Sequence, residues 1–270
     1  GFKWWALIIA VVFVISELVC VVCVPERPVA CDEKPGKISD MFKALFKNDQ
    51  AMTVVVSIIL VYTSLNICGN LVLYFFRFDV GNEGAYSIFA AVAFAAQVLV
   101  MMVIPLLRKR FSKSQLFISG FIIQISGFAV ILIMAFAKLY TPQSWYILCL
   151  PGILIYLGYG MLNVIMTIFL SDSVDYGEVM NGTREESVIF SMQTFTVKLA
   201  SGVAVFLAGL VVDWIHLDTA AAVQTQDTLD ALRMWMTIPS VILLIVGIFV
   251  FKRFYKLDDT RMEEIKSKLN

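Results

Sequence analysis

The sequence FLSDSVDYGEVMNGTREESVIFSMQTFTVKLASG, residues 169–202, joins the end of one apolar segment to a short acidic loop and then to a second apolar segment that carries a lysine. In the second segment, polar residues recur at steps of three and four, which places them on one face of a helix. They are Ser187, Ser191, Thr194, Lys198 and Ser201. Because a lysine in the middle of a membrane helix costs about 2.5–3.5 kcal/mol, this stripe predicts a cavity filled by water or ligand. Without Lys198, we would expect such small polar residues only to hold helices together.

The composition excludes an ordinary soluble domain, since 60% of the residues are hydrophobic and only 16% are charged. A helix needs about 20 apolar residues to cross a bilayer. The chain contains seven such runs, at residues 4–24, 51–76, 85–106, 115–137, 145–170, 187–213 and 234–252. The sequence therefore predicts an all-α integral membrane protein with seven transmembrane helices. Its formal net charge of +0 points to no nucleic-acid partner.

The distribution of basic residues predicts the orientation of these spans. If the first span runs from outside to inside, most Lys and Arg residues fall on the cytoplasmic side, as the positive-inside rule requires. The exceptions are Lys3, Arg77, Lys138 and Arg233. The tryptophans all lie at predicted outer ends, where an interfacial aromatic belt is expected; they are Trp4, Trp5, Trp145, Trp214 and Trp235. We therefore predict a multi-pass protein with a cytoplasmic C-terminus.

Residues 25–50 form the longest connection on the predicted cytoplasmic side. Prolines and a glycine interrupt its first half, and apolar residues at helical spacing predict a short amphipathic helix over residues 38–46 on the membrane surface. This connection is expected to link two bundles, of which residues 51–252 form the second and residues 253–270 its charged cytoplasmic tail. Since the chain opens at Gly1 without an initiator methionine, we expect it to be a piece of a longer polypeptide.

Polar residues also occur on two other spans. On the second span, Asn66 and Asn70 are four residues apart and share a helix face. On the fifth span, Asn163 lies in a stripe of small and polar residues, with Asp172 and Asp175 at its inner end. The spans contain no nucleophile–base pair, phosphate-binding loop or paired metal ligands, so the sequence predicts neither an enzyme nor a bound cofactor.

Several motifs resemble those of the glycoside–pentoside–hexuronide:cation symporter family, a melibiose-permease-like branch of the major facilitator superfamily. They are KNDQ at 47–50, GNEGAYS at 81–87, DSVDYGE at 172–178, REES at 184–187 and SMQTFTVKLASG at 191–202. The resemblance covers nearly the whole chain. It implies that residues 1–24 are the last helix of a missing N-terminal bundle and that residues 25–50 are the central cytoplasmic loop. The last six spans would then be the C-terminal bundle, built from two inverted three-helix repeats.

The resemblance also implies a function, namely alternating-access symport of a sugar or glycoside with Na⁺ or H⁺ across a bacterial inner membrane. Lys198 would face carboxylates of the missing bundle, where the coupling cation binds, and would link cation binding to sugar binding. The substrate-facing residues would be Lys198, Thr194, Gln193, Asn163, Asn66 and Asn70. The cytoplasmic gate would comprise Asp172, Asp175, Glu178, Arg184 and Glu185.

Three alternatives remain open at the level of sequence. The same fold carries other solutes, such as a lysolipid. A seven-helix receptor or retinal protein fits the number of spans, but the lysine of a retinal protein is expected on the seventh span rather than the sixth, and neither a DRY triplet nor an NPxxY motif is present. A scaffold or assembly subunit without cargo is less compatible with the polar stripes.

Overall fold

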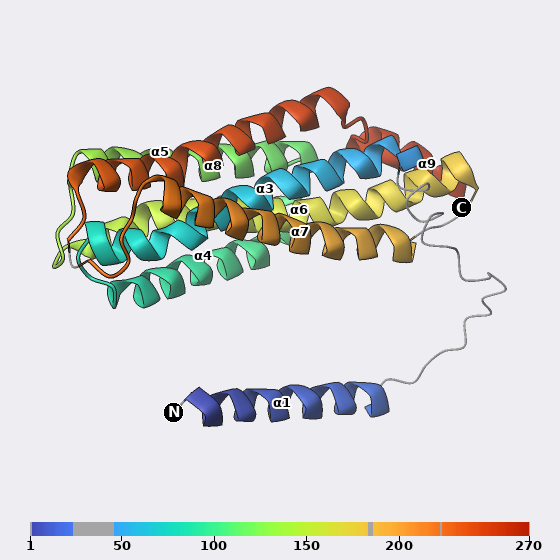
Figure 1. Ribbon diagram of the computed structural model, residues 1–270. Coiled ribbons are helices and arrows are strands. Elements are labelled where there is room, and N and C mark those ends of the chain that lie inside the picture. The colour runs from blue at the N-terminus through green and yellow to red at the C-terminus, as the bar shows by residue number, and fades with distance from the viewer. Residues whose placement is uncertain (1, 24–45, 183–185, 222, 270) are drawn as a thin grey trace. The chain divides into compact units, whose positions relative to one another are not determined.

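The computed structural model describes residues 2–23, 46–182, 186–221 and 223–269 (Figure 1). Within these ranges the regular structure is helical, and seven helices are long and apolar enough to cross a membrane. This confirms the predicted fold class. Helix α1 (Phe2–Cys23) belongs to one compact unit, residues 1–40, and the other helices belong to a second unit, residues 41–270. Most of the predicted amphipathic helix over residues 38–46 lies outside the described residues.

The described part of the second unit consists of long helices followed by a short terminal one. The helices are α3 (Asp49–Tyr74), α4 (Ala85–Leu107), α5 (Lys113–Phe136), α6 (Cys149–Asn181), α7 (Glu186–Trp214), α8 (Gln226–Phe254) and α9 (Asp259–Leu269). A π-helical segment, η1 (Phe75–Asp79), extends α3, and a 3-10 turn, η2 (Trp145–Leu148), precedes α6. We call the end of the bundle where α3 and α5 begin the inner end, and the opposite end the outer end.

Helices α3 and α6 form the centre of the bundle (Figure 1). Helix α5 packs on α6 and α8 packs on α3, while α4 lies along α6 and α7 lies along α3. The two sets of three helices, α3–α5 and α6–α8, therefore pack in corresponding ways: the third helix of each set packs on the first helix of the other set, and so does the second helix. This is the pattern expected of two three-helix repeats, and an odd number of spans in each repeat gives the second one the opposite direction in the membrane.

Small residues hold α6 between its neighbours. A Cβ atom on Gly158 would lie 2.6 Å from the main-chain nitrogen of Gln124 on α5, and a Cβ atom on Gly160 would lie 3.0 Å from the main-chain oxygen of Gln97 on α4. Close approach of helix backbones at small residues is a main source of packing energy in membranes. The two glycines therefore set how closely α6 approaches α4 and α5, and they thereby position the polar residues that follow on α6.

The acidic stretch at residues 172–178 is helical, so the prediction of a loop there is wrong. Helix α6 continues to Asn181 and ends where Gly182 adopts a left-handed conformation with φ of 73°, which glycine reaches at little cost. The poor helix propensity of Gly177 is offset by packing, because a Cβ atom there would lie 2.8 Å from the amide nitrogen of Asn48. Tertiary contacts thus extend α6 well beyond its apolar run.

Asn48 joins the inner ends of α3 and α6. Its Oδ1 accepts a hydrogen bond from the main-chain nitrogen of Ala51 at 2.9 Å and caps α3, while its Nδ2 donates to the main-chain oxygen of Ser173 at 2.8 Å. Two residues later, Gln50 accepts a hydrogen bond from the main-chain nitrogen of Lys256 at 2.8 Å. The KNDQ motif therefore connects α3 to α6 and to the segment after α8.

Replacing Asn48 with alanine is expected to lower the free energy of unfolding by about 1–3 kcal/mol, because the change removes a helix cap and leaves buried main-chain groups without partners. Unfolding of the protein in one fixed detergent measures the effect. Asn82→Ala is the matched control: Asn82 also accepts from a main-chain nitrogen and donates to a distant carbonyl, but it is at the exposed outer end. Equal losses in the two variants would contradict the role assigned to burial.

Candidate functional site

The polar residues of the two central helices meet at Asn163. Its Nδ2 donates to the Tyr62 hydroxyl on α3 at 2.6 Å, and the side chain is half-buried. The ring of Tyr62 packs edge-on against Tyr159 with centroids 5.5 Å apart. This aromatic contact orients the phenol that Asn163 binds. Tyr62 was not among the predicted site residues, because a tyrosine in an apolar helix cannot be told from a core residue by sequence.

Gln193 reaches the same group of residues from α7. Its Nε2 lies 3.4 Å from the Thr167 hydroxyl, which in turn donates to the main-chain oxygen of Asn163 at 3.1 Å. At 3.4 Å, the hydrogen bond from Gln193 to Thr167 is a weak one. The structure thus brings two predicted substrate-facing residues, Gln193 and Asn163, onto one surface formed by α3, α6 and α7.

Asn66 and Asn70 extend this surface along α3. The Asn66 amide donates to the main-chain oxygen of Tyr62 at 2.7 Å, and the Asn70 amide donates to the main-chain oxygen of Asn66 at 2.7 Å. Both side chains are half-buried. One N–H of each amide is therefore used within the helix, while the amide oxygens accept no hydrogen bond from the residues that the structure describes.

Lys198 and Thr194 lie on the face of α7 that the bundle leaves exposed. The opposite face of α7 is buried through Ala200, Ala204 and Ala208. The Thr194 hydroxyl bonds only to the main-chain oxygen of Phe190, at 3.3 Å. Lys198 forms no ion pair or hydrogen bond with any described residue, so the structure does not join it to the group around Asn163. Its charge is available to a group outside the bundle.

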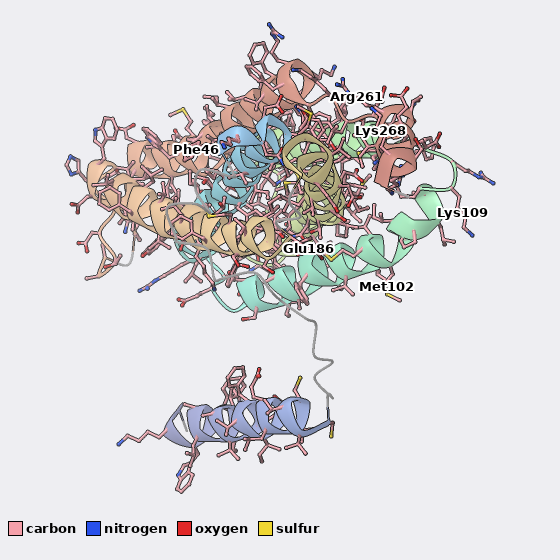
Figure 2. All side chains as sticks on the ribbon, turned by 90° about the vertical axis from the view of Figure 1, so that its right-hand side faces the viewer. Phe46, Met102, Lys109, Glu186, Arg261 and Lys268 are labelled. Atoms are coloured by element: carbon pink, nitrogen blue, oxygen red, sulfur yellow. The ribbon has the colours of Figure 1, made fainter. Side chains whose placement is uncertain are left out.

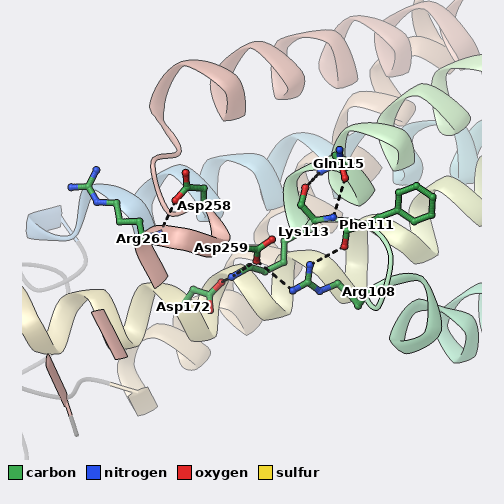
Figure 3. A network of polar contacts seen from close by, with 9 residues as sticks. Arg108, Phe111, Lys113, Gln115, Asp172, Asp258, Asp259 and Arg261 are labelled. Carbon is green, nitrogen blue, oxygen red and sulfur yellow. Dashed lines mark hydrogen bonds and ion pairs between the residues drawn. The ribbon is translucent and has the colours of Figure 1, made fainter. Parts of the chain in front are cut away.

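A charged network connects α4, α5, α6 and α9 at the inner end (Figure 3). Lys113 forms an ion pair with Asp172, and both side chains are 7% exposed. The Lys113 Nζ also lies 3.4 Å from Asp259, whose carboxylate accepts a hydrogen bond from Arg108 at 3.4 Å. Asp172, a predicted gate residue, therefore has its partner within the bundle. Sequence alone does not find Lys113, because the basic turn before α5 indicates only a membrane anchor.

The other predicted gate residues follow Asp172 along the chain. Asp175 and Glu178 are half-buried near the end of α6, one and two turns beyond Asp172. Arg184 and Glu185 lie outside the described residues. The acidic side chains thus continue in a row from the buried ion pair toward the end of the helix.

A second buried ion pair lies at the outer end. Asp79, the last residue of η1, binds Arg233 of α8 through Nε at 2.9 Å and Nη2 at 2.5 Å, and both side chains are 3% exposed. The hydroxyl of Tyr140 donates to the same carboxylate at 2.5 Å. Burial and the neighbouring Asp79 raise the pKa of the Tyr140 phenol, so that it remains a protonated donor. Asp230 completes the network by accepting from Arg233 Nη1 at 2.7 Å.

This outer network is not evident from the sequence. Arg233 stands just before the predicted last span and counts there as one of the few outer charges. In the structure, α8 begins earlier, at Gln226, and carries Arg233 into the bundle. A π-helical turn shifts the residues after it relative to an α-helix, and η1 ends in Asp79. The position of Asp79 therefore depends on a π-helical turn that the local sequence pattern does not predict.

The fold of the second unit is that expected of a bundle of the major facilitator type, with six membrane-length helices in two similarly packed sets of three and polar residues on the central pair. A family model described as MFS/sugar transport protein matches residues 1–259, and the chain belongs to this family. The predicted resemblance is thereby confirmed. The family consists of transport proteins, which also confirms the prediction of a transporter rather than an enzyme.

Three relatives are each similar to most or all of this chain but to only about half of their own length. The chain is 24% identical to the raffinose carrier protein of Pediococcus pentosaceus over 276 residues, covering 100% of this chain and 42% of the relative. It is 25% identical to the isoprimeverose transporter of Lactiplantibacillus pentosus, covering 96% of this chain and 52% of the relative. It is also 25% identical to an uncharacterized symporter of Bacillus subtilis, covering 86% and 49%. The chain thus spans about half the length of these relatives.

Proposed function

We propose that the chain is part of a secondary active transporter that moves a sugar or glycoside by alternating access, coupled to Na⁺ or H⁺. The names of the raffinose and isoprimeverose relatives support a sugar as cargo, and the name of the symporter relative supports coupling to an ion. Because the chain spans about half of these proteins, the activity is proposed for the complete transporter, including an N-terminal bundle that α1 would close.

The exposed position of Lys198 is the observation that carries this proposal. The residue lies in the middle of a membrane-length helix and has no partner among the described residues. An unpaired cation there costs about 2.5–3.5 kcal/mol, so a partner is expected on another part of the transporter. We infer that carboxylates of the N-terminal bundle face Lys198. A cation that neutralises those carboxylates would change what the lysine pairs with, which couples the two binding events.

The surface around Asn163 is the proposed sugar-binding face. Sugar hydroxyls need several hydrogen-bond partners, and this face offers the Asn163 amide, the Gln193 amide and the free oxygens of Asn66 and Asn70. Gln193 and Thr194 precede Lys198 by about one turn on α7. A sugar bound here would therefore lie between the amide groups of α3 and α6 and the cation of α7.

The inner end is the proposed cytoplasmic gate. Ion pairs at helix ends in wet surroundings form and break at modest cost, as alternating access requires. We assign this exchange to Asp175, Glu178, Arg184 and Glu185. Asp172 has a different role in the gate, because its buried bond to Lys113 would hold α6 against α5 while the four gate charges beyond it change partners.

Replacing Asn163 with alanine in the complete transporter is expected to raise the KM for sugar about tenfold, since a hydrogen bond to a polar ligand contributes roughly 1–2 kcal/mol. Uptake of labelled glycosides into vesicles under Na⁺ or H⁺ gradients measures the change and identifies the ion. Ser126→Ala on α5, whose hydroxyl bonds only its own helix at Ile123, is the control. An unchanged KM would contradict the assignment of Asn163, and no uptake of any glycoside by the folded transporter would contradict the sugar proposal.

A further inference from the structure

Helices α4 and α5 are consecutive in the chain but pack on α6 rather than on each other. The space between them forms a crevice of about 430 Å³ near the inner end. It is lined by Leu107, Phe111, Gln115, Leu116, Ser119 and Met161. Met161, on α6, lies buried at its floor, whereas Phe111 at its mouth is 47% exposed. From Gln115 to Ser119 the crevice follows α5 for a distance on the order of 6 Å.

The crevice is apolar in spite of its two polar side chains. Gln115 Oε1 accepts a hydrogen bond from the main-chain nitrogen of Ser112 at 3.0 Å, and the Ser119 hydroxyl donates to the main-chain oxygen of Leu116 at 2.8 Å. The Gln115 side-chain oxygen and the Ser119 hydroxyl are thus already bonded within α5 and its cap. A crevice of this kind on the surface of two membrane helices favours a hydrocarbon chain over water, which would find few hydrogen-bond partners there.

Two exposed cations lie in the turn between Leu107 and Phe111, both of which line the crevice. Lys109 and Arg110 follow Arg108 in this turn and are exposed, and their side chains form no ion pair or hydrogen bond with the part of the chain that the structure describes. Figure 2 shows Lys109 projecting beyond the end of α4. Arg108 differs, since it turns toward Asp259 and the main-chain oxygen of Phe111 (Figure 3). Residues 105–120 contain no Asp or Glu that would neutralise the pair.

We propose that this crevice binds an acyl chain of an anionic phospholipid, and that Lys109 and Arg110 hold the headgroup phosphate. The apolar crevice selects a lipid over a free phosphate ion. The two unpaired cations select an anionic lipid over a zwitterionic one, because basic residues at the membrane surface attract anionic headgroups. The bound lipid fills the gap between α4 and α5 and so braces two helices that hardly touch each other.

The test uses the full chain, stripped of lipid in detergent, with Phe111→Trp as a fluorescent reporter at the mouth. Phospholipids with brominated acyl chains quench a nearby tryptophan, and the native tryptophans, all predicted at the outer end, are subtracted with the unsubstituted chain. Phosphatidylglycerol is expected to quench the reporter at about tenfold lower concentration than phosphatidylcholine. Adding Lys109→Gln and Arg110→Gln should remove this preference. Adding Lys252→Gln and Arg253→Gln, an exposed basic pair at the end of α8, should preserve it.

Two further measurements locate the lipid. Ser119→Phe fills the crevice and is expected to reduce quenching by both lipids, whereas unchanged quenching would overturn the assignment of the acyl chain to this crevice. Native mass spectrometry without the reporter should find phosphatidylglycerol retained by the unsubstituted chain and lost from Lys109→Gln/Arg110→Gln. Equal quenching by the two lipids, or equal loss of preference in the two double variants, would overturn the headgroup site.

Discussion

Replacing Lys198 with alanine is expected to uncouple sugar binding from cation binding in the complete transporter. Coupling free energies between two binding sites correspond to changes in affinity of roughly 5- to 150-fold. We expect the ratio of sugar affinities with and without the coupling cation to fall from this range to about one. The reason is that Lys198, on the exposed face of α7, has no ion-pair partner among the described residues, so we expect the two sites to communicate through its charge. Sugar binding measured at several cation concentrations tests this directly.

Two variants make the Lys198 experiment specific. Lys198→Arg keeps the positive charge and is expected to retain most of the coupling, although its planar group binds carboxylates in a different geometry. Lys252→Ala removes an exposed lysine at the inner end of α8 and should leave the ratio unchanged. If Lys198→Ala keeps the cation dependence of sugar affinity, the coupling role proposed for this residue is wrong.

Replacing Asp79 with asparagine is expected to destabilise the bundle by about 3–5 kcal/mol, the cost of leaving one member of a buried ion pair without its partner. Arg233 would then remain 3% exposed at the outer end with a neutral side chain in place of the carboxylate. The Tyr140 hydroxyl would lose the charge that strengthens its hydrogen bond. Denaturation in a fixed detergent, followed by loss of helical signal, measures the change.

The adjacent ion pair between Arg77 and Glu83 provides the control. Its atoms are 3.7 Å apart and its side chains are 45% and 59% exposed, so Glu83→Gln is expected to cost less than about 1 kcal/mol. The double substitution Asp79→Leu/Arg233→Leu removes both buried charges and should recover much of the stability lost in Asp79→Asn. If Asp79→Asn and Glu83→Gln have equal effects, burial does not govern the strength of the outer pair.

The membrane spans were predictable because each one depends on a local property. A run of about 20 apolar residues must lie in hydrocarbon as a helix wherever it stands in the chain, and the predicted runs agree with the observed helices. The main error in their bounds was at residues 172–178, where charge predicted a loop and the structure has a helix. There the contact of Gly177 with Asn48, a residue far away in the sequence, outweighs local preference.

The candidate site was predictable only in part. Helical spacing places Thr194 and Lys198 on one face of α7, and it places Asn66 and Asn70 on one face of α3. Gln193 was predicted only from the family resemblance. Helical spacing does not reveal that Asn163 meets Tyr62 or that Asp172 meets Lys113, since these partners are on different helices. The substrate, gate and coupling roles of the predicted residues stay predictions until the transport experiments are made.

The sequence by itself determined that this protein crosses a membrane through seven apolar helices and belongs to a sugar-transport family. Both conclusions depend on local stretches of sequence, namely the length of each apolar run and the residues of each motif. Only the tertiary structure decided which charges are buried and which remain free. Arg233 and Lys113 became members of buried ion pairs, whereas Lys198 stayed exposed. The physical reason is that a charge is neutralised by whatever packing brings within a few ångströms of it, and that partner is set by the arrangement of the helices.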